Sequence, residues 1–232
     1  MSAWPAAVIF DFDGVLVNSE PLHFEAFREV LAGEHLELAE DEYYRDLIGF
    51  DDAGAFRHFY KTRGLTLAPK TFLALMANKS QAMMTSIRNR RFSALPGVEQ
   101  FVRDLWRKYP LAICSGALRE EIEAMLEGIS LRDCFSVIVA AEDVTVGKPD
   151  PQGYLLSIKQ LAAKIHRPLK PANCLIVEDA PSVIHTVKRE GFRVLGVATS
   201  YSLEKLAEAD WQVKTLEPDV MRKAIPELAL DQ

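Results

Sequence analysis

Short apolar segments alternate with amphipathic helical patterns along most of this chain. Such alternation is typical of a parallel β-sheet whose strands are joined by crossover helices, because the helices cover the faces of the sheet. The pattern predicts an α/β fold with a doubly wound parallel sheet. The expected strands cover residues 6–10, 111–114, 136–141, 174–178, 193–198 and 211–213, and the expected helices cover residues 98–109, 118–129, 150–165 and 180–191.

Residues 19–92 interrupt this alternation. Helical patterns cover residues 20–32, 53–64 and 69–90, and no stretch between them has the character of a strand. A helical lobe inserted directly after the first strand is the simplest explanation, with a Pro-Gly turn at residues 96–97 leading back into the sheet. We therefore expect an α/β core domain formed by residues 1–18 and 93–232, and a helical domain formed by residues 19–92.

The charge pattern argues against several classes of partner. The chain carries 27 Lys and Arg against 33 Asp and Glu, a net charge of −6, with the two signs interleaved. Nucleic acid and anionic membranes are therefore not expected partners.

The N-terminus lacks a basic segment and its apolar stretch ends at Asp11, so we expect neither a signal peptide nor a membrane span. Cys114, Cys134 and Cys174 lack metal-binding spacing and are expected to be buried thiols of a cytoplasmic protein.

Polar residues follow several of the predicted strands. Ligands bind beyond the carboxyl ends of the strands in a doubly wound sheet, so these residues are expected to converge on one edge. They have ordinary alternatives: Asp11 or Ser115 as a turn or cap residue, Glu178–Asp179 as a simple helix cap, and Lys148 as a surface lysine. Their joint placement at strand ends favours a functional site. The set comprises Asp11, Asp13, Ser115, Gly116, Lys148, Glu178 and Asp179.

This set has the chemistry of a site for magnesium and phosphate. Its four carboxylates repel one another unless a cation offsets their charge. Oxygen ligands suit Mg²⁺, which shares the rest of its coordination shell with water and a substrate phosphate. The hydroxyl and the lysine can hold phosphate oxygens, and Lys148 also offsets the charge of Asp11. The chain has no GxxxxGK[ST] motif, which argues against a P-loop nucleotide site.

Four motifs, in this order, resemble those of the haloacid dehalogenase superfamily of phosphotransferases. They are VIFDFDGV at residues 8–15, LAICSGA at 111–117, VGKPDP at 146–151 and LIVEDAPS at 175–182. The resemblance covers essentially the whole chain and depends on both spacing and order. It implies a Rossmann-like doubly wound core with an inserted α-helical cap domain that closes over the substrate.

The resemblance also implies roles for individual residues. Asp11 is implied to be the nucleophile that forms an aspartyl-phosphate, and Asp13 the general acid and base. His23 matches a histidine near the acid/base residue of some members and is included among the substrate-binding candidates, although a hydrogen-bonded helix histidine is its ordinary interpretation. The implied metal ligands are Asp11, Asp13 through its carbonyl, Asp179, and Glu178 directly or through water, and the implied phosphate-binding residues are Ser115, Gly116 and Lys148.

Within the superfamily, the chain is most similar to the group that contains phosphoglycolate phosphatase, sugar-phosphate phosphatases and β-phosphoglucomutase. Halide displacement is disfavoured because it needs neither the second aspartate, Asp13, nor the Glu178–Asp179 pair. A receiver-like signalling module is disfavoured because it orders its acidic residues differently. A Mg²⁺-dependent phosphatase for a small sugar or polyol phosphate is favoured, and a phosphomutase and a phosphoglycolate phosphatase remain the alternatives.

The stretch LIGFDDAGAF at residues 47–56 bears on this choice. It carries Asp51 and Asp52 where the mutase has a basic residue for a second phosphate. We expect Phe50, Asp51 and Asp52 to approach the leaving group and to favour sugar or polyol monophosphates over bisphosphates and phosphoglycolate. Lys79 is expected to be a solvated helix lysine. We further expect Mg²⁺ as the cofactor, a small phosphate ester as the partner, and a monomer.

Overall fold

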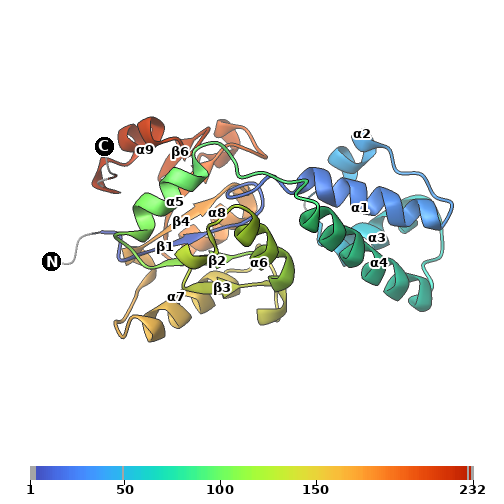
Figure 1. Ribbon diagram of the computed structural model, residues 1–232, viewed down its shortest axis with the longest axis horizontal. Coiled ribbons are helices and arrows are strands. Elements are labelled where there is room, and N and C mark those ends of the chain that lie inside the picture. The colour runs from blue at the N-terminus through green and yellow to red at the C-terminus, as the bar shows by residue number, and fades with distance from the viewer. Residues whose placement is uncertain (1–3, 49, 229, 231–232) are drawn as a thin grey trace. The chain divides into compact units, whose positions relative to one another are not determined.

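The computed structural model describes residues 4–48, 50–228 and 230 and contains a six-stranded parallel sheet (Figure 1). Its strand order is β3-β2-β1-β4-β5-β6, the order of a Rossmann-type doubly wound sheet. The predicted fold class is therefore confirmed. The strands are β1 (Ala7–Phe10), β2 (Leu111–Cys114), β3 (Val137–Val139), β4 (Cys174–Glu178), β5 (Arg193–Val197) and β6 (Trp211–Val213).

All six strands lie where the apolar segments predict them. Strand β3 is shorter than the predicted 136–141, because the chain turns into a short 3-10 helix at Ala141–Asp143. The carboxylate of Asp143 accepts a hydrogen bond of 2.8 Å from the backbone N–H of Ala140, which stabilises this turn and ends the strand.

Helices cover both faces of the sheet. Strand β1 is buried along its whole length, and its side chains alternate between two cores. Ala7 and Ile9 belong to the core formed with α7 (Gln152–Lys164) and α8 (Pro181–Arg189). Phe10 instead packs edge-on against Phe101 of α5 (Val98–Trp106). Helix α6 (Arg119–Gly128) follows β2, and α9 (Pro218–Ala224), which the sequence analysis did not predict, follows β6.

The segment between β1 and α5 is helical. It contains α1 (Glu20–Gly33), α2 (Glu40–Glu42), a π-helical turn (Tyr43–Leu47), α3 (Asp52–Thr62) and α4 (Pro69–Arg88). None of its described residues forms a strand, as predicted. Aromatic side chains dominate its separate core, in which Phe27 of α1 contacts Phe56 of α3 with ring centroids 4.8 Å apart.

The chain divides into two compact units, one formed by Met1–Asn18 with Ser93–Gln232 and the other by Ser19–Phe92. We call them the α/β unit and the helical unit. The two connecting segments run beside each other in the α/β unit. Val17 and Ala94 form an antiparallel bridge, and the N–H of Asn18 donates to the carbonyl of Ser93 at 3.3 Å. The insertion therefore begins and ends at one point of the α/β unit.

The three cysteines are buried and unpaired, as predicted. Burial raises the pKa of both the Cys114 and the Cys174 thiols to about 12, which keeps them protonated and unreactive. Within residues 4–48, 50–228 and 230, no helix has the length and apolar character needed to cross a membrane.

Gly97 marks the return of the chain into the α/β unit. It precedes α5 in a left-handed conformation with φ of +82°. A Cβ at this position would lie 2.2 Å from the backbone nitrogen of Glu217, so the backbone of the C-terminal region leaves no room for one. Both its conformation and its surroundings therefore require glycine.

We predict that Gly97→Ala lowers the free energy of unfolding by more than about 4 kcal/mol, because it combines left-handed strain with a backbone clash. Gly191→Ala is the matched control: Gly191 has φ of +87° in the same unit but open space around its Cβ position. That variant should lose only about 1–2 kcal/mol. Urea denaturation measures both values. Equal losses would contradict the importance of the Glu217 contact.

Candidate active site

The predicted site residues of the α/β unit meet at the centre of the sheet, where β1 and β4 are neighbours. Phe10 and Val177 are paired in register, so the next residues, Asp11 and Glu178, emerge side by side. The N–H of Asp11 donates to the carbonyl of Val177 at 2.9 Å. Here the strand order reverses, since β1 continues to β2 on one side and β4 to β5 on the other. This is the topological switch point at which such sheets bind ligands.

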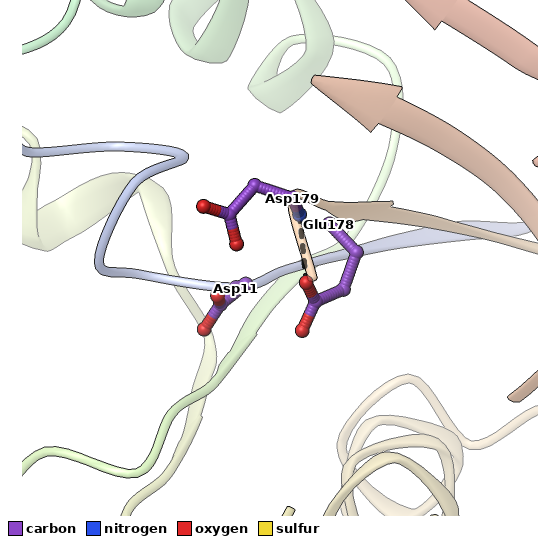
Figure 2. Close-up of side chains that lie close together, drawn as sticks. All are labelled: Asp11, Glu178 and Asp179. Carbon is purple, nitrogen blue, oxygen red and sulfur yellow. Dashed lines mark hydrogen bonds between the residues drawn. The ribbon is translucent and has the colours of Figure 1, made fainter. Parts of the chain in front are cut away.

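Three carboxylates gather at this point (Figure 2). Asp11, Glu178 and Asp179 each offer an oxygen, and these oxygens lie within 4.8 Å of one another. All three residues are buried, with exposed fractions of 8%, 0% and 5%. Such a group of buried negative charges requires compensating positive charge.

Lys148 supplies part of that charge. Its ammonium lies 2.6 Å from Oδ1 of Asp11 and 2.8 Å from Oε1 of Glu178. The lysine stands in the turn before α7 and is therefore held by an element that is separate from β1 and β4. One ammonium among three carboxylates leaves the cluster with an excess of negative charge.

Burial and this excess of negative charge both shift the pKa values of the acids. Burial raises the pKa of Asp11 well above its ordinary value, against the lowering effect of Lys148, and Glu178 and Asp179 raise it further. Burial and the charge of Glu178 raise the pKa of Asp179 to about 7. A divalent cation would relieve this repulsion, and an all-oxygen donor set fits a hard cation. The carboxylates of this chain therefore fit a metal site.

Ser115 and Asp13 lie at the same edge. Ser115 follows β2, and its Oγ is 3.4 Å from Oδ2 of half-buried Asp13. The same Oγ accepts a hydrogen bond of 3.0 Å from the N–H of Ala117, so the chain turns around it at Gly116. Asp13 also contributes to the raised pKa of Asp179, which places its charge near the three-carboxylate cluster.

Two hydroxyl residues of this edge escaped the sequence analysis. Ser200 donates a hydrogen bond to Oδ2 of Asp179, and Thr199 donates one to the carbonyl of Gly14. Both follow β5, and their position just after a predicted strand is the available signal, although hydroxyl residues are ordinary in turns. Gly14 is required here, because a Cβ on it would lie 2.3 Å from Oδ2 of Asp179.

His23 and Lys79 belong to the helical unit, where they contact each other. The ammonium of Lys79 lies 2.7 Å from Nδ1 of His23 and 2.7 Å from Oδ1 of Asp52. Lys79 is completely buried, so the prediction of a solvated lysine is wrong. Burial, with the charge of Lys79, lowers the pKa of His23 well below its ordinary value. The imidazole is therefore neutral, accepts at Nδ1 and carries its hydrogen on Nε2.

The acidic segment at the start of α3 is exposed in part. Phe50 is 50% exposed and stacks on His58, with ring centroids 5.0 Å apart. Asp51 is the N-cap of α3 and accepts a hydrogen bond of 2.6 Å from the N–H of Gly54. Asp52 instead turns to Lys79. The two neighbouring aspartates therefore have different roles: one caps a helix and the other pairs with a buried cation.

Comparisons with known proteins agree with this arrangement. The sequence model of the haloacid dehalogenase-like hydrolase family matches residues 8–197. The protein CbbY of Rhodobacter capsulatus is 30% identical over 230 residues, which cover 96% of this chain and 98% of that relative. A phosphorylated carbohydrates phosphatase of Thermotoga maritima is 26% identical over 226 residues, which cover 96% of this chain and 99% of that protein.

A solved structure supports the same fold. The crystal structure of CbbY from Rhodobacter sphaeroides in complex with phosphate superposes with a TM-score of 0.82 at 22% identity, over 97% of this chain and 99% of that chain. The family match extends from Val8 in β1 to the end of β5, and this stretch contains every predicted site residue. This chain therefore belongs to the haloacid dehalogenase-like hydrolases.

Proposed function

We propose that the protein is a Mg²⁺-dependent phosphatase that hydrolyses a small sugar or polyol phosphate through a phosphorylated Asp11. The observation that carries this proposal is the buried group of Asp11, Glu178 and Asp179, whose oxygens lie within 4.8 Å, with Lys148 on Asp11. The group stands at the switch point of the sheet, where a phosphate ester can reach it. The phosphatase name of the Thermotoga maritima relative supports the reaction class.

The chemistry would divide into two steps. A carboxylate oxygen of Asp11 attacks the phosphorus atom, the ester P–O bond breaks, and Asp13 gives its proton to the leaving alcohol. Asp13 then takes a proton from a water molecule, which attacks the phosphorus atom and releases inorganic phosphate from Asp11. The hydroxyl of Ser115, the backbone N–H of Gly116 and the ammonium of Lys148 would hold phosphate oxygens.

Asp11, Asp179 and the carbonyl of Asp13, with Glu178 directly or through water, would hold the metal ion. When bound, Mg²⁺ offsets the negative charge that a phosphate adds to three carboxylates. Glu178 has no solvent exposure, and Lys148 remains beside it as the second positive charge of the site.

The helical unit supports a substrate without a second anionic group. Lys79 is buried, and Asp52 neutralises its charge at 2.7 Å. The ammonium is therefore not free to bind a second phosphate or a carboxylate. This pairing favours sugar or polyol monophosphates over the bisphosphate of a mutase and over phosphoglycolate, and the carbohydrate in the name of the Thermotoga maritima relative is in line with it.

We predict that the wild-type protein releases inorganic phosphate from sugar or polyol monophosphates in Mg²⁺ and that EDTA abolishes this activity. Asp13→Asn should lower kcat by at least about a hundredfold, because it removes the proton donor. It should keep its affinity for Mg²⁺, because the proposed ligand atom of Asp13 is a backbone carbonyl. A phosphate-release assay and isothermal titration calorimetry with MgCl₂ measure the two effects.

Asp133→Asn, which changes an exposed aspartate on the short helix Arg132–Cys134, is the control and should behave as wild type. Absence of phosphate release from a broad panel of phosphomonoesters would overturn the proposed function. Conversion of a hexose 1-phosphate to its isomer without phosphate release would instead establish the mutase.

We predict that Asp52→Asn raises kcat/KM for phosphoglycolate relative to a neutral polyol phosphate by about tenfold, or about 1.4 kcal/mol, because it leaves the charge of Lys79 uncompensated. Asp51→Asn is the matched control: it removes the same charge from the neighbouring residue, which caps α3 and does not contact Lys79. Steady-state kinetics with both substrates measure the ratio. Equal shifts of the ratio in the two variants would show that general surface charge causes the preference. An unchanged ratio in Asp52→Asn would show that Asp52 does not contribute to substrate selectivity.

A further inference from the structure

Tyr154 lies directly behind the carboxylate cluster. It is in the first turn of α7 and has no solvent exposure. Its hydroxyl donates a hydrogen bond of 3.1 Å to Oε1 of Glu178. In the sequence it has the appearance of an ordinary core aromatic of an amphipathic helix, and the proposed reaction assigns it no part.

The tyrosine hydroxyl completes the set of donors around Glu178. Oε1 accepts from the ammonium of Lys148 at 2.8 Å and from Tyr154. Oε2 accepts from the backbone N–H groups of Asp179 and Ala180, each at 2.7 Å. Four donors thus surround the two oxygens of one buried carboxylate. These contacts fix the orientation of both oxygens of Glu178.

The ring of Tyr154 supports Lys148 as well. The ammonium lies 5.0 Å from the ring centroid, within the range of a cation–π contact. The same ammonium bonds Asp11 at 2.6 Å and Glu178 at 2.8 Å. One side chain therefore contacts both Lys148 and Glu178, through its ring and its hydroxyl respectively.

Local packing holds the tyrosine in this position. The preceding residue, Gly153, lets α7 approach β2 closely, because a Cβ there would lie 2.6 Å from Sγ of Cys114. Phe192 packs edge-on against the tyrosine ring, with centroids 6.5 Å apart. The ring is thus fixed by the core, and its hydroxyl has a fixed direction toward Glu178.

We infer that Tyr154 is a positioning residue of the active site, which acts through Glu178 and Lys148 and does not touch the substrate. Its hydroxyl keeps Glu178 oriented, and Glu178 in turn keeps Lys148 on Asp11 and the backbone of Asp179 in place. Without the hydroxyl, a buried carboxylate oxygen lacks one donor and Glu178 loses its single orientation. This inference rests on the proposed function, which makes these residues the metal and phosphate site.

The test compares Tyr154→Phe, which keeps the ring and removes the hydroxyl, with the wild type. We expect the dissociation constant for Mg²⁺, measured by isothermal titration calorimetry with MgCl₂ alone, to rise about tenfold. We expect kcat on the best phosphomonoester to fall by about the same factor, while the melting temperature without metal stays within a few degrees of wild type. Tyr154→Leu, which also removes the ring, should in addition weaken the affinity for inorganic phosphate through Lys148.

Tyr109→Phe is the matched control, because it removes a half-buried hydroxyl of the same unit that donates to the carbonyl of Leu228 at 3.4 Å. It should bind Mg²⁺ as wild type does.

A Tyr154→Phe variant with wild-type Mg²⁺ affinity and kcat would overturn the inference while leaving the proposed function intact. A variant that only melts earlier, with Mg²⁺ affinity unchanged, would show a purely structural role and would also overturn it. A wild-type protein that neither binds Mg²⁺ nor hydrolyses any phosphomonoester would instead refute the proposed function itself.

Discussion

Repulsion among three buried carboxylates is the constraint around which the α/β unit is organised. Asp11, Glu178 and Asp179 lie close together with Lys148 beside them, and burial, together with their mutual repulsion, raises the pKa values of Asp11 and Asp179. Folding tolerates this arrangement because the surrounding backbone and side chains supply donors to individual oxygens. The same excess of negative charge that lowers the stability of the fold also favours the binding of a divalent cation at this site.

The helical unit handles buried charge differently. Its buried ammonium, Lys79, is matched by Asp52 at 2.7 Å and by the lone pair of His23 at 2.7 Å. The Lys79–Asp52 ion pair has no net charge with which to bind a charged ligand. The α/β unit thus contains a group of like charges that a cation can offset, whereas the helical unit balances the charge of its buried lysine internally. We relate this difference to the proposed preference for substrates with a single phosphate.

Much of the α/β unit could be predicted because parallel strands buried on both faces are continuous apolar segments, and because Asp11 and Glu178 directly follow or end such segments. The environment of Lys79 could not be predicted, since its partner Asp52 lies on another helix and helical periodicity describes only one helix at a time. Ser200 and Tyr154 escaped because a serine in a turn and an aromatic in a helix are ordinary at those positions. Their roles depend on hydrogen bonds to Asp179 and Glu178 from distant parts of the chain.

The pairing of the two connecting segments, at Val17 with Ala94 and at Asn18 with Ser93, has a consequence for how such proteins diversify. An insertion whose ends already lie together is equivalent, for the rest of the chain, to a surface loop, and its length and content contribute little to the entropy of closing that loop. The helical unit can therefore be lengthened, shortened or replaced while the sheet and the candidate site at its edge keep their fold. Under the proposed function, changes in the inserted helical unit would alter the choice of substrate while the residues proposed to carry out the reaction stay in place.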